Sequence, residues 1–125
     1  MEVPILKQGP YLIATIQTAL SDTDLIALRE ALIAKVGTCR SRAVIIDVTA
    51  MDVMDSFSCR TLRDIAHTIQ LRGAETCIVG IQPDVAFAMV RLGLTLEGIT
   101  TALDLEEGLE YLGRKARKEI GSRGR

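Results

Sequence analysis

The sequence predicts an α/β protein in which short apolar strands alternate with amphipathic helices around a mixed, mostly parallel β-sheet. Residues 43–48 form a run that is apolar and mostly β-branched except for Asp47 near its end, as expected of a strand that is buried on both faces. Residues 76–81 form a second such run. A helical apolar stripe follows each run, and this alternation requires parallel neighbouring strands. We therefore expect a single domain with about four helices and the order β-β-α-β-α-β-α-β-α.

The N-terminal part predicts a hairpin and a first helix. Two short β-rich runs, Val3 to Leu6 and Tyr11 to Ile16, are separated by residues 7–10, which contain Gly-Pro and predict a turn. A helix is expected from the capping residues that begin at Ser21 to about Val36. Gly37 is the expected stop of that helix, because glycine is common at helix C-termini.

The second strand-to-helix connection carries the polar side chains of greatest interest. Asp52 and Asp55 lie in a short acidic loop after the central strand, and Ser56 and Ser58 then open a helix that is expected to end at Gly73. The two hydroxyls are thus predicted just beyond the carboxyl end of a central strand. In open α/β sheets, ligands and chemistry collect at this edge.

The remaining elements follow the same pattern. Pro83 opens a third helix, which Gly93 is expected to end. Residues 98–101 predict a brief last strand, and Asp104 with Glu107 provides a capping box for the final helix.

Four apolar side chains fall outside the core stripes that the helical periodicity predicts. Ile26 and Ile33 lie on the first helix, and Phe87 and Val90 lie on the third. A wider core face is the default explanation for the first pair. If these side chains are exposed, they are interface candidates, and on this basis we expect the chain to self-associate.

Composition and charge indicate one globular domain. The chain has 125 residues, of which 48% are hydrophobic, which is enough for a real core. We assign residues 1–113 to the domain and residues 114–125 to a basic helix end and tail. The tail has no interleaved aromatic residues, so a solvated face is favoured over nucleic-acid binding. No apolar run approaches the roughly 18 residues of a membrane span, and no signal peptide is apparent, so a cytoplasmic protein is expected.

The residues do not assemble a recognisable catalytic or metal centre. His67, the single histidine, is expected in the middle of a helix about three turns from the serines, too far for a Ser–His relay. No nucleotide-binding or nucleophile-elbow motif occurs, and the three cysteines have no C-x-x-C spacing. Asp47, Asp52 and Asp55 make only a weak Mg²⁺ site. We expect no enzyme activity, metal or cofactor. The serines are then helix caps or kinase substrates, and the residues alone favour capping.

A family resemblance changes that balance. The chain, from about residue 3 to residue 113, resembles the STAS domains of anti-sigma-factor antagonists, and within that group the small scaffold proteins of the bacterial stressosome. The stretches that carry the resemblance are IDVT (46–49), DVMDSF (52–57), GIQP (80–83) and TALDLEEGLE (101–110).

The resemblance implies a non-enzymatic scaffold and phosphorylation switch in stress signalling. Its implied partners are sensor proteins with a STAS domain, a GHKL-type serine switch kinase and a PP2C-type phosphatase. The family phosphoserine directly follows an aspartate, which corresponds to Ser56. Many members have glycine soon afterwards, whereas Phe57-Ser58-Cys59 follows here, so Ser58 is a second candidate. Asp52, Asp55 and Phe57 would belong to the partner-binding loop.

A different class of function remains open at the same edge. A STAS-like module could bind a small ligand there, such as a nucleotide or a lipid. A deep apolar pocket at the loop would favour that alternative, and a flat acidic loop would favour the switch.

Overall fold

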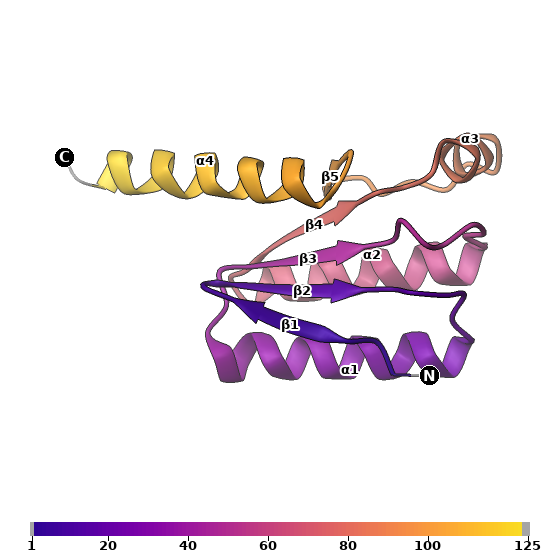
Figure 1. Cartoon of the computed structure of the whole chain (residues 1–125), viewed down its shortest axis with the longest axis horizontal. Helices are drawn as coiled ribbons and strands as arrows, with labels where there is room; N and C mark the ends of the chain where they lie inside the picture. The colour runs from indigo at the N-terminus through magenta and orange to yellow at the C-terminus, as the bar shows by residue number, and fades with distance from the viewer. Residues whose placement is uncertain (1, 124–125) are drawn as a thin grey trace.

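The computed structural model describes residues 2–123, with side chains as far as Lys118, and confirms the expected order of elements (Figure 1). The strands are β1 (Ile5–Gln8), β2 (Tyr11–Thr15), β3 (Ala43–Asp47), β4 (Glu75–Val79) and β5 (Thr100–Ala102). The helices are α1 (Asp22–Cys39), α2 (Ser56–Leu71), α3 (Pro83–Arg91) and α4 (Leu105–Arg123).

The strands form one mixed sheet in the order β1-β2-β3-β4-β5. β1 pairs with β2 antiparallel, and every other neighbouring pair is parallel. The register aligns Ile13 of β2, Ile45 of β3 and Cys77 of β4 across the sheet. β3 is therefore the central strand, as its continuous apolar run predicts.

The two faces of the sheet are covered unequally. One face carries the larger core, to which α1, α2 and α3 contribute apolar stripes. Its helical members are Leu28, Leu32, Val36, Cys59, Leu62, Ile65, Ile69, Val85 and Met89. The other face carries a smaller core, where α4 packs Leu112 against Ile13, Ile45 and neighbouring side chains. Figure 1 shows α4 running along this face and on past the sheet.

The prediction that α1 stops at Gly37 is wrong. The helix continues to Cys39, and Arg40 makes the left-handed turn at its end, with φ of 48°. The guanidinium of Arg72 lies over Gly37, with Nη2 2.5 Å from the position that a β-carbon would occupy. This group is the far end of a flexible side chain and can move, so the glycine is tolerated within α1 without being required there.

Three strand boundaries also differ from the expected ones. β1 is shifted toward its turn and extends to Gln8, so the turn contains only Gly9 and Pro10. β4 ends at Val79 because Gly80 leaves the strand conformation, with φ of 81°. β5 begins two residues later than expected, after Gly98, which has φ of 78°.

The final helix crosses the expected boundary at residue 113 without a break and reaches Arg123. Gly124 and Arg125, which belong to the expected tail, lie outside the described residues. Within residues 2–123, no helix combines the length and the apolar character that crossing a bilayer requires.

Candidate functional site

The loop after β3 is fixed to the neighbouring strand by a small hydrogen-bond network. Oδ1 of Asp47 accepts bonds from the backbone N–H of Thr49 at 3.0 Å and from its hydroxyl at 2.6 Å. Nε2 of Gln82 then donates to the Thr49 carbonyl at 2.6 Å. The start of the acidic loop is therefore tied to the β4–α3 connection.

The roles of Thr49 and Gln82 in this network were not predicted from the sequence. A side-chain bond from aspartate to a backbone N–H two residues later is the geometry of an Asx turn, which the Asp-Val-Thr spacing is consistent with. The sequence alone contains no signal that joins Gln82 to Thr49, because that contact depends on the parallel pairing of β3 with β4.

Asp55, Ser56 and Ser58 lie together at the start of α2, as expected. Asp55 is the N-cap, and its Oδ1 accepts the N–H of Ser58 at 2.8 Å. This bond, together with one from the Ser58 side chain, lowers the pKa of Asp55. The carboxylate therefore stays ionised and satisfies an otherwise unpaired donor at the helix end.

The two serines have different environments. Ser56 is the first residue of α2 and is exposed, whereas Ser58 is only 6% exposed. Both the backbone N–H and the side chain of Ser58 bond to Asp55, and little of the residue is accessible. Ser56 is thus the hydroxyl that a protein partner reaches without disturbing the helix.

The rest of the loop alternates between buried and exposed residues. Met51 and Met54 are buried in the larger core, whereas Asp52 and Val53 are exposed. Phe57 is half-buried. The loop therefore presents carboxylates and one apolar side chain on a fixed backbone, which suits recognition by a protein.

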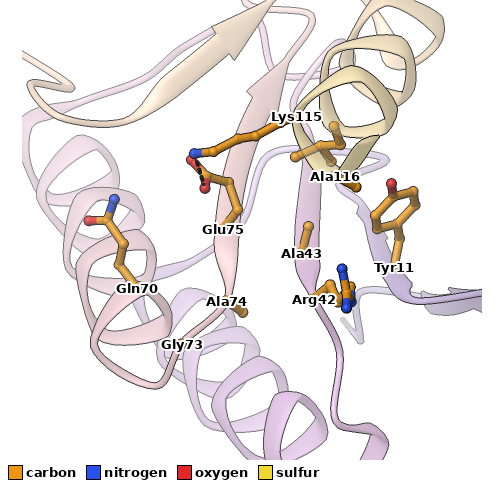
Figure 2. Close-up of a pocket in the computed structure, with 10 residues that line it drawn as sticks. Tyr11, Arg42, Ala43, Gln70, Gly73, Ala74, Glu75, Lys115 and Ala116 are labelled. Carbon is orange, nitrogen blue, oxygen red and sulfur yellow. Dashed lines mark hydrogen bonds and ion pairs between the residues drawn. The ribbon is translucent and has the colours of Figure 1, made fainter. Parts of the chain in front are cut away.

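Two cavities in the described part of the chain lie away from this loop. Figure 2 shows one of about 400 Å³ at the amino-terminal end of the strands, beneath α4. Its lining includes Tyr11, Arg42 and Gln70, and the ion pair of Lys115 with Glu75 crosses it. A second cavity, of about 620 Å³, lies between the N-terminal segment and α1. Neither contains a residue of the 48–58 loop, so neither supports a ligand at the loop edge.

The histidine and two of the cysteines, side-chain types that often act in catalysis, lie in unreactive surroundings here. His67 is exposed, and its Nε2 lies 3.3 Å from the carbonyl oxygen of Glu97. Burial raises the pKa of the Cys59 thiol and raises that of Cys77 to about 11, so both are protonated at neutral pH. Among the described residues, no group of three or more His, Cys, Asp or Glu side chains is placed to hold a metal ion.

The four interface candidates form two separate surfaces. Phe87 and Val90 are 64% and 77% exposed on α3, where the guanidinium of Arg91 lies 5.7 Å from the Phe87 ring centroid. On α1, Ile26 is 40% exposed and Ile33 is half-buried. Figure 1 places α1 and α3 well apart, so the two pairs do not form one patch.

Comparison with known proteins identifies the fold family. A model of the STAS domain matches residues 2–108. The chain belongs to the STAS domain family. The structure of the S58E variant of RsbS from Moorella thermoacetica, numbered in that protein, is 35% identical and superposes with a TM-score of 0.81. The superposition covers 92% of this chain and 97% of that one.

Two further STAS proteins are similar to this chain. A chain in the structure "Molecular architecture of the stressosome, a signal integration and transduction hub" is 34% identical, with a TM-score of 0.76 over 91% of this chain and 99% of that one. The RsbT co-antagonist protein RsbRA of Bacillus subtilis (strain 168) is 29% identical over 85 residues, which is 68% of this chain but 31% of RsbRA. The STAS chain thus spans less than a third of that curated relative.

Proposed function

We propose that this STAS domain is a non-catalytic scaffold and phosphorylation switch of a stressosome-type assembly in the cytoplasm. The observation that carries the proposal is an exposed hydroxyl, that of Ser56, at the head of α2 in a chain that matches RsbS along nearly its whole length. In this role the chain co-assembles with the STAS domains of RsbR-like sensor proteins. It holds an RsbT-like, GHKL-type serine kinase, which leaves after it phosphorylates the loop, and a PP2C-type phosphatase resets the switch.

Ser56 is the preferred acceptor on physical grounds. A kinase must place the serine Oγ in line with the γ-phosphate of ATP, and an exposed first-turn residue permits this. Ser58 is buried, so the start of α2 would have to open before a kinase could reach its hydroxyl. Backbone N–H groups and the helix dipole at the N-terminus of α2 favour the phosphate once it has formed.

The surfaces for the remaining partners follow from exposure. Asp52, Asp55 and the half-buried Phe57, together with the exposed Val53, form the face that meets the kinase, next to the acceptor. Phe87 and Val90 on α3 form an apolar surface for a neighbouring STAS domain, and the weaker pair on α1, Ile26 with Ile33, is a second one. The pairs are far enough apart to serve two different contacts, which a multi-subunit shell requires.

The proposal is tested by incubating the chain with ATP and a GHKL-type serine kinase of this signalling class, followed by mapping of the phosphate. We expect phosphate on Ser56, loss of labelling in Ser56→Ala, and near-normal labelling in the matched variant Ser58→Ala. Labelling of Ser58 in the intact chain would assign the switch to the buried serine. Phosphate that remains elsewhere in the Ser56→Ala, Ser58→Ala double variant would contradict a switch in this loop.

A further inference from the structure

The first strand of the sheet has an open edge with a defined set of hydrogen-bonding groups. Among the described residues, β1 has one strand neighbour, β2. The carbonyl of Pro4 accepts the N–H of Thr15 at 3.2 Å. Because the backbone groups of an antiparallel strand face alternate sides, those of residues 4, 6 and 8 point to β2. The N–H and C=O groups of Ile5 and Lys7 therefore point outward, away from the sheet.

An apolar side chain marks the same edge. Leu6 lies opposite Ile13, so both side chains are on the face of the sheet that α4 packs against. Ile13 is 4% exposed because it packs with Leu112 of α4, whereas Leu6 on the edge strand is 61% exposed. The edge strand thus carries a large apolar side chain that is mostly exposed.

Together, these features fit a second copy of the same strand. We propose that two copies pair their β1 strands antiparallel about a two-fold axis at Leu6, which joins their sheets into one. In this register, Ile5 of each copy exchanges both backbone hydrogen bonds with Lys7 of the other. The two Leu6 side chains then face each other at the non-hydrogen-bonded position, where side chains approach most closely.

The neighbouring groove has a net negative charge, which suits this register. The groove between β1 and α1 is lined by Ile5, by the carboxylates Glu2 and Asp24 and by the ammonium group of Lys35. Lys7 of the second copy lies opposite Ile5 and on the same face, so its ammonium group approaches the partner's groove from the side of β1. A lysine on a short edge strand often protects against pairing. Here the two-fold register places that lysine next to a groove whose carboxylates outnumber its lysine.

The proposal does not depend on the phosphorylation switch, because β1 and Ser56 are on different elements and the test uses unphosphorylated protein. The first test is Lys7→Pro, measured by sedimentation equilibrium. Proline removes an outward N–H and leaves the β1–β2 bonds intact, so two of the four inter-copy bonds are lost. We expect self-association about tenfold weaker or more, with an unchanged circular dichroism spectrum. An intact chain that is monomeric at tens of micromolar, or association unaffected by Lys7→Pro, would overturn the proposal.

A disulfide test fixes the register independently. In Leu6→Cys, two thiols face each other across the axis, and we expect a covalent dimer under mild oxidation. The matched variant Gln8→Cys lies on the same face of the same strand. Its two thiols would be about 14 Å apart along the paired strands at a rise of about 3.4 Å per residue, so no cross-link is expected. Equal cross-linking of the two variants, or none in Leu6→Cys, would refute the register.

Discussion

Gly80 and Thr49 fit against each other at the carboxyl edge of the sheet so closely that no side chain is possible at position 80. A β-carbon on Gly80 would overlap the Thr49 hydroxyl and would lie 3.2 Å from Oδ1 of Asp47. Gly80 also has φ of 81°, in the left-handed region. The glycine thus admits the turn that begins the acidic loop, and the loop's position depends on it.

Gly80→Ala is expected to destabilise the fold well beyond the effect of backbone strain alone. The left-handed conformation costs about 1–2 kcal/mol for an alanine, and the overlap with Thr49 adds about 1–3 kcal/mol. Gly93→Ala is the matched control, because Gly93 has φ of 70° and open space around its β-carbon position. Urea unfolding measures both free energies, and equal losses for the two variants would show that the contact with Thr49 is unimportant.

The bond from Gln82 to the Thr49 carbonyl should have a measurable effect on stability. Gln82→Ala removes the donor and is expected to lower the free energy of unfolding by about 0.5–1.5 kcal/mol. Gln82→Glu should cost more at neutral pH, since it sets a carboxylate against a carbonyl oxygen only 2.6 Å from the original donor. Chemical unfolding of the three proteins side by side provides the test. A glutamate variant as stable as the wild-type chain would mean that the bond does not form in solution.

Asp55 should make the stability of α2 depend on pH in the acid range. Hydrogen bonds from Ser58 hold the folded pKa below the ordinary value of 3.8. A lowered folded pKa contributes stability above the unfolded pKa, and this contribution is lost as the pH falls through the folded pKa. Asp55→Ala should therefore cost about 1 kcal/mol at pH 7 and progressively less below about pH 4.

Asp55→Asn is the control for that experiment. Asparagine caps a helix about as well as aspartate but does not titrate, so its stability relative to alanine should stay level with pH. If the difference between the aspartate and alanine variants stays constant between pH 7 and pH 3, the carboxylate does not have the lowered pKa that its hydrogen bonds indicate.

The sequence predicts most of the fold because the core is periodic. The apolar stripe of α2 and the continuous apolar run of β3 depend on local spacing, and the buried residues include Leu62, Ile65 and Ile69 as expected. Gly37 does not end α1 because glycine is also tolerated inside a helix, at a cost of about 1 kcal/mol. The left-handed turn that ends the helix is made three residues later by Arg40, a residue type that does not predict it.

The residue types at the start of α2 were predicted from the sequence, but their burial and their contacts with other elements were not. The pairing of a capping aspartate with serines at a helix start is a local pattern, and Asp55 and Ser58 confirm it. The burial of Ser58 beside an exposed Ser56 was not predicted, since it depends on how α2 rotates against the sheet. The role of Gln82 depends on strand order, which no single segment specifies.

The apolar surface of α3 should contribute to co-assembly with a sensor STAS domain. Phe87→Ser together with Val90→Ser removes two exposed apolar side chains and should weaken that complex about tenfold or more, without loss of fold. Leu71→Ser is the control, because Leu71 is even more exposed than Phe87 and Val90 but lies at the end of α2, outside the proposed surfaces. Analytical ultracentrifugation of mixtures provides the measurement, and equal effects of the two changes would remove α3 from the interface.

Phosphorylation of Ser56 should act on partner binding and leave the fold in place. The modification adds a charge of about −1.5 to −2 at the head of α2, where helix-terminal N–H groups accommodate an anion. Arg60 lies one turn further along the helix, and an exposed pair with it would add only about 0–1 kcal/mol. The added charge, next to Asp52 and Asp55, therefore acts mainly on the protein that docks against the loop.

We expect the affinity for the kinase to fall by about 5- to 150-fold on phosphorylation, a coupling of about 1–3 kcal/mol. Calorimetry and circular dichroism on both forms would measure this. Equal kinase affinity would refute the switch, and a large loss of helix would replace it with an order–disorder mechanism.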